Sequence, residues 1–459
     1  MLGAKAMRGA RIILAVAGAV LLAAAAPFAP PDAGTRTIYR HATLIDGTGA
    51  PPRPDMAVVT DGDRIEAVAA DAALAPAQLQ GARIVDLTGR WLLPGLIDSH
   101  QHMATPPDPV RARAWLRRDI YSGITATRIM ADDLRSIAEL DREARTGEIA
   151  GPDLAFAAVM AGPSFFADPR THAISAGWTP GETPWAQSID DSTDLRLAVA
   201  RAKGTGATAI KIYANLPARL VRAIAAEAHR QGMRVWTHAM VFPATPAEVI
   251  AAGPDTMSHS CYLAYQLSSP PPQSYQDRFP VDYPAFAHGD NPVMTRLFEE
   301  MRRRHIILDA TLNVYAEADR RAAAPGGRPY HCTLDLAGRL TDQARRQGVE
   351  ISAGTDGDTP ATAAWPALFD ELELLVLRAG MTPLQAIHSA TQVGAQAMGE
   401  GDRRGTIQPG RIADLVVLDR DPTADIANMR SVVLTVKHGR PFARSDYVPI
   451  TAAEVPDDD

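Results

Sequence analysis

The sequence predicts an α/β protein: a (β/α)8 TIM barrel, accompanied by a small β domain that both ends of the chain build together. Its length of 459 residues accommodates one large and one small domain. Short apolar, strand-like segments alternate with helix-like segments through the middle of the chain. Antiparallel β patterns occur near both ends, and the two ends of a folded chain commonly lie close together.

The small β domain is expected at residues 37–93 and 394–447, with the barrel between them at 94–393. In the first part, Asp61-Gly62-Asp63 separates two β-like runs, which is the pattern of a hairpin. In the second part, the apolar run Ala413–Leu418 follows a Pro-Gly turn and is expected to be a strand.

The barrel is predicted from eight strand-like segments, with helices between them that carry clear start signals. Thr245-Pro246-Ala247-Glu248 and Thr382-Pro383-Leu384-Gln385 both have the sequence of a capping box with proline in the first turn. A doubly wound open sheet is the alternative, which is weakened because no Gly-rich phosphate-binding motif follows any strand. The eight expected strands are Leu96–His100, Ile124–Ile129, Leu154–Met160, Thr208–Tyr213, Arg234–His238, Thr256–His259, Ile306–Thr311 and Glu350–Gly354.

Composition and charge exclude several classes of protein. Hydrophobic residues make up 46% of the chain and charged residues 22%, values that exclude a disordered or fibrous protein. The formal net charge is −7 and no basic run occurs, so we expect no nucleic-acid partner. The two cysteines, Cys261 and Cys332, are too few for a disulfide scaffold or a cysteine-type zinc site, and whether they pair stays open.

Residues 1–26 are predicted to be a signal peptide. Lys5, Arg8 and Arg11 precede an apolar run that ends at Leu22, and small residues follow it. The run is shorter than the roughly 20 residues that cross a bilayer, although a retained anchor helix is the alternative. We therefore expect a periplasmic or secreted protein with no stable membrane insertion after signal removal.

Candidate metal ligands stand at the ends of predicted strands. His100 and His102 end the first barrel strand two residues apart, so both side chains point to one face. His238, His259 and Asp356 end three further strands. Because these ends meet at the face of a barrel where active sites lie, the five side chains are expected to converge. Imidazoles with a carboxylate are ligands suited to Zn²⁺ or a similar metal.

Lys211 lies in the apolar segment Ala209–Tyr213 of a chain that is poor in lysine. One interpretation is a snorkelling or salt-bridged lysine at the end of the barrel. The other is a desolvated lysine with a lowered pKa, whose free amine reacts with CO2. The carbamate formed in this way offers two oxygens, which would bridge two metal ions.

Three motifs resemble those of the metal-dependent amidohydrolase superfamily. They are WLLPGLIDSHQH at 91–102, GITAT at 123–127 and GTIQPGRIADLV at 405–416. The Ala-Ile-Lys stretch at 209–211 is similar to the imidazolonepropionase-like and Xaa-Pro dipeptidase-like branch. The resemblance implies a distorted barrel with a β-sandwich made from both termini. It also implies two divalent metal ions, with zinc as the expected metal. The ligands it implies are His100 and His102 for one ion, His238 and His259 for the other, carboxylated Lys211 as a bridge, and Asp356 at the first ion.

These expectations describe an exported hydrolase that cleaves a C–N amide bond of a dipeptide, an N-acyl amino acid or a related amide. A metal-bridging hydroxide would attack the carbonyl carbon, and Asp356 would accept its proton and pass it to the leaving nitrogen. Two long connections after strands are candidates for the substrate pocket, although their aromatic residues could equally serve packing. The candidate substrate contacts are Arg170, His172, Tyr213 and Tyr262.

Two other functions remain as alternatives. The same resemblance implies that a mononuclear-metal deaminase of this fold would have a glutamate shortly after the third histidine, but His238 is followed by Ala239-Met240-Val241-Phe242. A non-catalytic exported binding protein would be expected to have lost ligands, whereas all six positions are present. A homo-oligomer is compatible with each of these functions.

Overall fold

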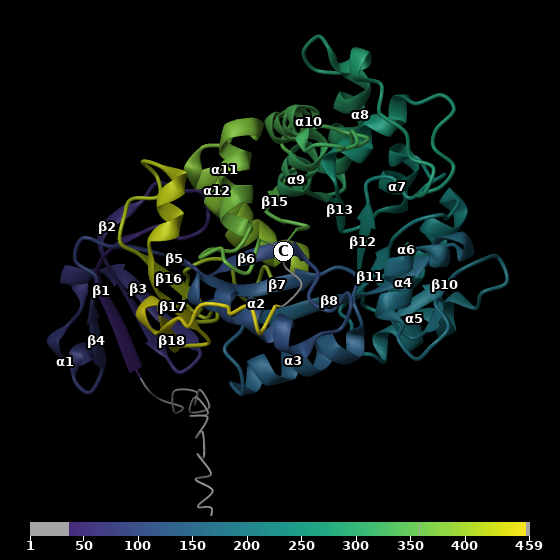
Figure 1. The fold of residues 1–459 in the computed structure, drawn as a ribbon. Coiled ribbons are helices and arrows are strands. Elements are labelled where there is room, and N and C mark those ends of the chain that lie inside the picture. The colour runs from purple at the N-terminus through teal and green to yellow at the C-terminus, as the bar shows by residue number, and fades with distance from the viewer. Residues whose placement is uncertain (1–35, 358, 456–459) are drawn as a thin grey trace, which may run out of the picture.

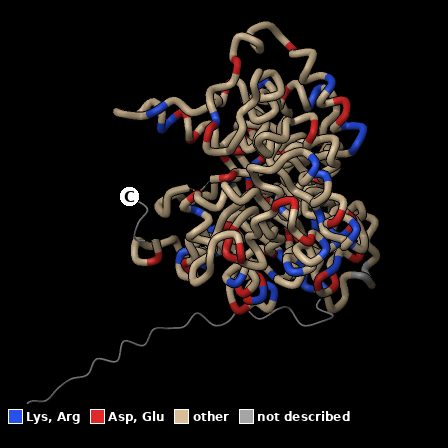
Figure 2. The backbone as a smooth tube through the Cα atoms, turned by 90° about the vertical axis from the view of Figure 1, so that its right-hand side faces the viewer, with Lys and Arg blue, Asp and Glu red and all other residues tan. Residues whose placement is uncertain are grey.

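A computed structural model describes residues 36–357 and 359–455, which form a barrel and a smaller sheet beside it (Figure 1). The predicted signal peptide at residues 1–26 lies outside the described residues. None of the helices in the described part of the chain has the length and hydrophobicity that a bilayer-spanning helix requires. Positive and negative residues are interspersed along the chain and do not gather on one face (Figure 2).

The smaller sheet contains strands from both ends of the chain. Its order is β18-β17-β16-β5-β1-β2-β3, with β4 paired to β1. The two ends meet where β16 pairs antiparallel with β5, so the purple and yellow strands lie side by side in Figure 1. The sheet consists of β1 (Arg36–Leu44), β2 (Arg53–Asp61), β3 (Arg64–Ala70), β4 (Arg83–Asp86), β5 (Trp91–Pro94), β16 (Leu415–Leu418), β17 (Val432–Lys437) and β18 (Arg440–Ala443).

The barrel is built from parallel strands in the order in which they occur along the chain. Two backbone hydrogen bonds join its first strand to the segment that directly follows its last strand: Ser99 N donates to Ala353 O at 2.8 Å, and Asp356 N donates to His100 O at 2.9 Å. The short strands β9 (Glu182–Thr183) and β10 (Ala186–Ser188) extend the sheet beside β8. The barrel strands are β6 (Leu96–Gln101), β7 (Ile124–Ile129), β8 (Asp153–Ala161), β11 (Ala209–Ile212), β12 (Arg234–His238), β13 (Thr256–Ser258), β14 (Ile307–Asp309) and β15 (Ile351–Ser352).

The predicted fold class is confirmed, and each of the eight expected strands overlaps one barrel strand. The later strands are shorter than expected. β13 ends at Ser258 because His259 has a φ of 72°, which is incompatible with extended backbone. Asp356 lies past the end of β15, and like His259 it has a positive φ, of 44°.

Helices connect the barrel strands and surround them (Figure 1). Both predicted capping boxes are present, at Thr245 and Thr382. The helices are α1 (Pro76–Leu79), α2 (Pro109–Tyr121), α3 (Leu134–Thr146), α4 (Pro169–Ile174), α5 (Leu195–Lys203), α6 (Ala218–Arg230), α7 (Pro246–Ala252), α8 (Pro292–Arg303), α9 (Leu312–Ala323), α10 (Leu334–Arg346), α11 (Leu368–Ala379), α12 (Pro383–His388) and α13 (Gly394–Met398). Short 3-10 segments lie at Asp71–Ala73, Pro163–Ala167, Ser260–Leu267, Tyr283–Phe286, Ile426–Ser431 and Arg444–Asp446, and a π-helical turn lies at Ser389–Val393.

A buried cluster of charged residues joins the small sheet to the barrel. Asp153, at the start of β8, lies 2.8 Å from Lys437 Nζ and 2.7 Å from His438 Nε2, both from the β17 end of the small sheet. Arg404 Nη2 lies 2.5 Å from the same carboxylate. Burial alone would raise the pKa of Asp153, but Lys437 and Arg404 hold that pKa well below its usual value.

Candidate metal centre

The predicted ligands come together at the carboxyl ends of the barrel strands. His100 is the penultimate residue of β6, and His102 directly follows that strand. His238 ends β12, and His259 directly follows β13. The ring centroids of His100 and His259 are 5.1 Å apart, and those of His238 and His259 are 4.8 Å apart. The strand ends therefore place all four imidazoles within one small volume.

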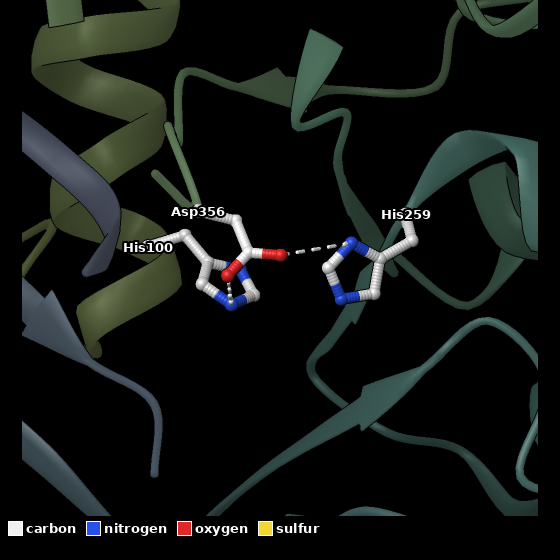
Figure 3. A group of neighbouring side chains, drawn as sticks. All are labelled: His100, His259 and Asp356. Atoms are coloured by element: carbon white, nitrogen blue, oxygen red, sulfur yellow. Dashed lines mark ion pairs between the residues drawn. The ribbon is translucent and has the colours of Figure 1, made fainter. Parts of the chain in front are cut away.

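Asp356 lies between His100 and His259 (Figure 3). Its Oδ1 is 3.4 Å from His100 Nε2 and 3.3 Å from His102 Nε2, and its Oδ2 is 3.6 Å from His259 Nδ1. Burial alone would raise the pKa of Asp356, but the neighbouring histidines hold that pKa well below its usual value. The carboxylate is therefore ionised and faces several imidazole nitrogens at once.

Asp309, in β14, is the supporting residue that the sequence analysis missed. Its Oδ2 lies 2.8 Å from His100 Nδ1, 3.0 Å from Arg128 Nη2 and 2.9 Å from Ser258 Oγ. Because Nδ1 of His100 is held by this carboxylate, Nε2 is the nitrogen presented to the site. The sequence feature that could have identified Asp309 is a carboxylate inside an apolar strand of the barrel. A charged residue inside an apolar strand is also what singled out Lys211.

Lys211 lies in β11 and is completely buried. Its Nζ lies 3.5 Å from Ser258 Oγ, and it forms no ion pair with any residue that the structure describes. Burial lowers the pKa of Lys211 to about 7, with a smaller contribution from Arg128 in the same direction. A substantial fraction of the amine is therefore neutral near pH 7, which is the form that can react with CO2.

The donor set fits divalent metal ions. Nδ1 of His238 is buried and has no hydrogen-bond partner among the described residues, so this nitrogen is free to act as a ligand. Burial lowers the pKa of His238 well below its usual value, which keeps the ring neutral, as a metal requires. Ligand atoms of His100, His259 and Asp356 all lie within 4.8 Å of one another, so one ion could contact all three.

A cavity of about 320 Å³ opens above this cluster. His100, His102, His259 and Asp356 form its floor. Of the predicted substrate contacts, Arg170, Tyr213 and Tyr262 line the cavity, whereas His172 is exposed on α4 and is not among the described lining residues. The lining residues that the sequence analysis did not name as substrate contacts include Phe165, Tyr275, Val314, Tyr315 and Tyr330.

A disulfide braces the wall of the cavity. Cys261 and Cys332 are bonded, with their Cα atoms 6.3 Å apart, and both are fully buried. Cys261 follows His259 by two residues, and Cys332 follows Tyr330 by two residues. The bond therefore links the segment after a predicted metal ligand to the segment that carries a cavity-lining tyrosine.

The parallel barrel carries histidines and a carboxylate at the carboxyl ends of its strands, which is the face where barrel enzymes have their active sites, and these residues form a candidate site for divalent metals. The Amidohydrolase family matches residues 331–441. Imidazolonepropionase from Pseudomonas putida (strain KT2440) is 27% identical over 428 residues, covering 85% of this chain and 95% of the relative.

Solved structures show the same architecture. A Xaa-Pro dipeptidase with bound methionine in the active site superposes with a TM-score of 0.69 at 20% identity, covering 89% of this chain and 100% of that one. Ochratoxinase from A. niger superposes with a TM-score of 0.70 at 23% identity, covering 90% and 96%. The family match and the similarity to imidazolonepropionases support membership of the amidohydrolase superfamily, whose members generally bind divalent metals, and they support a hydrolase that acts on C–N bonds.

Proposed function

We propose that this protein is an exported, binuclear metal-dependent amidohydrolase that cleaves the amide bond of a dipeptide, an N-acyl amino acid or a related small amide. The observation that carries the proposal is the convergence of four histidines, Lys211 and Asp356 at the floor of one cavity or directly beneath it. The names of the relatives agree with amide chemistry on small molecules.

The chain's own residues have separate tasks. His100 and His102 would hold one ion, His238 and His259 the other, and carboxylated Lys211 would bridge them. When bound, the two ions would activate a water molecule and polarise the carbonyl group of the amide. Asp356 would accept the proton of the attacking water and deliver it to the leaving nitrogen. The ionised state of Asp356 fits the first of these two roles.

The mononuclear deaminase remains the weaker alternative. Deamination of a ring requires a second acid that protonates the ring nitrogen. Asp356 is the only carboxylic acid among the described residues that line the cavity. Because Asp356 must already accept the proton of the attacking water, the cavity is better suited to amide hydrolysis.

Export is part of the proposal for two reasons. The order of charged, apolar and small residues at 1–26 is typical of a signal peptide. The Cys261–Cys332 disulfide is compatible with an oxidising compartment such as the periplasm. N-terminal sequencing of protein recovered from the native host should find a chain that lacks roughly the first two dozen residues, whereas an intact Met1 in the membrane fraction would indicate an anchor.

The decisive experiment combines metal analysis with a substrate screen. Protein purified without chelators should contain close to two divalent ions per chain, and it should hydrolyse members of a panel of dipeptides and N-acyl amino acids. Chelation should abolish the activity, and added zinc should restore it. A single ion together with ammonia release from ring amines would favour the deaminase, and inertness with full metal occupancy would favour the binding protein.

A further inference from the structure

Helix α9 begins with a threonine in an unusual conformation. Thr311 occupies the N-cap position with a φ of 52° and a ψ of 47°, which is an outlier for a β-branched residue. Its side chain makes no capping hydrogen bond to this helix. By contrast, Thr333 and Thr382, at the N-caps of α10 and α12, have extended backbone and cap their helices with their own hydroxyls. Thr311 therefore holds a strained conformation that does not serve the usual task of an N-cap threonine.

A carboxyl group from another helix caps α9 instead. Glu371, in α11, accepts from Leu312 N at 3.1 Å through Oε1 and from Asn313 N at 2.7 Å through Oε2. Glu371 is fully buried, and no basic residue in the described part of the chain forms an ion pair with it. A buried carboxyl group is costly unless it is hydrogen-bonded, and these two N–H groups are the partners that it has here. Glu371 thus satisfies the N–H groups that an N-cap side chain would otherwise satisfy.

The hydroxyl of Thr311 contacts a predicted metal ligand. Its Oγ1 lies 3.0 Å from His259 Nδ1, and both side chains are buried. An imidazole that binds a metal through one nitrogen almost always donates the hydrogen on its other nitrogen to a neighbouring acceptor. Thr311 supplies such an acceptor, so Nε2 of His259 is the nitrogen presented to an ion, as it is in His100.

The same turn of α9 reaches two other parts of the site. Nδ2 of Asn313 lies 3.5 Å from the carbonyl oxygen of Thr355, the residue directly before Asp356. Val314 and Tyr315 line the cavity. The position of this first turn therefore matters to the metal centre and to the cavity together, and Glu371 is the side chain that fixes it.

We propose that Glu371 is a positioning residue for the metal centre, because it caps α9 in place of Thr311 and leaves the Thr311 hydroxyl to hold the ring of His259. Neither Glu371 nor Thr311 is among the described residues that line the cavity. The inference rests on the metal-binding part of the proposed function. Its readout is metal affinity, which can be measured without turnover.

The first test compares zinc affinities in competition with a chromophoric chelator. Thr311→Val keeps the shape of the side chain and removes the hydroxyl, so the ion bound by His259 should be held about 10- to 100-fold more weakly. Thr311→Ser keeps the hydroxyl and should bind this ion nearly as the wild type does. In cobalt-substituted protein, the visible absorption spectrum reports the geometry of the ligands, and it should change in Thr311→Val but not in Thr311→Ser.

The second test asks whether Glu371 acts through Thr311. Glu371→Gln offers one acceptor oxygen and sets an NH2 group against the second backbone N–H, so it should weaken the same ion by about 10-fold. The double variant Glu371→Gln/Thr311→Val should lose no more affinity than Thr311→Val alone, because residues that act through one contact are not additive. Should Glu371→Gln not fold, Glu371→Asp is the second variant, since its shorter side chain keeps the carboxyl group but holds it further from α9.

Asp194→Ala is the matched control for loss of a helix cap. Asp194 is exposed, and its side chain caps α5 by accepting from Leu197 N at 3.1 Å. Its replacement should lower the unfolding midpoint and leave both metal affinities unchanged. The control therefore separates a general loss of stability from a loss of positioning at His259.

Wild-type affinity for both ions in a folded Thr311→Val protein, or additive losses in the double variant, would overturn the inference. Wild-type affinity in the Glu371 variants would do the same. If the affinities follow the expected pattern but no amide is hydrolysed, the proposed function fails and the positioning role of Glu371 stands. A wild-type protein that binds no divalent ion would overturn both.

Discussion

The carboxylate of Asp309 holds the buried ring of His100, with Oδ2 2.8 Å from Nδ1, and it thereby turns Nε2 toward Asp356. Asp309→Asn should lower the affinity for divalent metal by about 10- to 100-fold, because residues that orient a metal ligand have effects of that size. The measurement is metal release in competition with a chromophoric chelator.

Asp335→Asn is the control for Asp309→Asn, because Asp335 is exposed on α10 and its one ion pair among the described residues is with Arg339. The Asp309 variant should also lose stability, since Arg128 is fully buried and would lose its ionic partner. Metal affinity equal to wild type in the folded Asp309→Asn protein would show that the contact does not position His100.

Lys211→Ala should abolish most amide hydrolysis, and an added short-chain carboxylate such as propionate should restore part of it. The expected bridge needs only two carboxylate oxygens, and the removed side chain leaves room for a small acid that must bear the entropy of being localised. Lys211→Arg should not be rescued, because the guanidinium fills the space and stays charged. Full activity with two bound metals in Lys211→Ala would make the lysine purely structural.

Asp153→Asn should lower the free energy of unfolding by about 3–5 kcal/mol, because buried Lys437 would lose its counter-ion and buried Arg404 would lose one of its carboxylate partners. The pKa of Asp153 is lowered in the folded protein, so its contribution to stability is fully present above the unfolded value of roughly 4. That contribution is lost as the pH falls from there toward the folded pKa.

Urea unfolding of the wild type and of Asp153→Asn at several pH values measures this difference. The difference in the free energy of unfolding between the wild type and Asp153→Asn should be large at pH 6 and should shrink below pH 4. Asp419→Asn, which removes an exposed carboxylate 3.4 Å from Arg90, should change stability by less than about 1 kcal/mol. If this difference in the free energy of unfolding grows as the pH falls, the ionised carboxylate of Asp153 does not stabilise the fold.

Replacing Cys261 and Cys332 together by alanine should destabilise the fold by about 4 kcal/mol, since the disulfide closes a loop of 71 residues. It should also raise KM, because Tyr330 lies two residues from Cys332 and lines the cavity. Unfolding midpoints and steady-state kinetics of the double variant, compared with the wild type in the absence of reductant, test both effects. Unchanged KM would mean that the loop holds its position without the bond.

The barrel could be predicted because its strands are apolar runs and its helices carry capping boxes, both of which are local features. The convergence of His100, His238, His259 and Asp356 followed from the topology, because parallel strands end at one face of a barrel. Lys211 could be singled out because a lysine inside an apolar strand needs an explanation. These inferences needed no knowledge of the loops.

The rest of the site depends on loop conformations that have no periodicity to read. Tyr275, Tyr330 and Arg278 lie in long connections, and their meeting at one wall is set by packing and by the Cys261–Cys332 bond. Asp309 was missed for another reason. Its role depends on its contact with His100, and the two residues are 209 positions apart in the sequence. His172 illustrates the opposite error, since a histidine near the pocket in sequence lies on the outer face of α4.

The small sheet imposes an order of events on folding. β5 has β16 as its antiparallel partner, and that partner is synthesised only after the entire barrel sequence. The N-terminal strands must therefore wait, with an unpaired edge, until nearly the whole chain is available. A chain that stops before Leu415 would have every predicted metal ligand and would still expose that edge. Such truncated chains should aggregate. The C-terminal strands β16, β17 and β18 therefore protect the new protein from aggregation as well as completing its sheet.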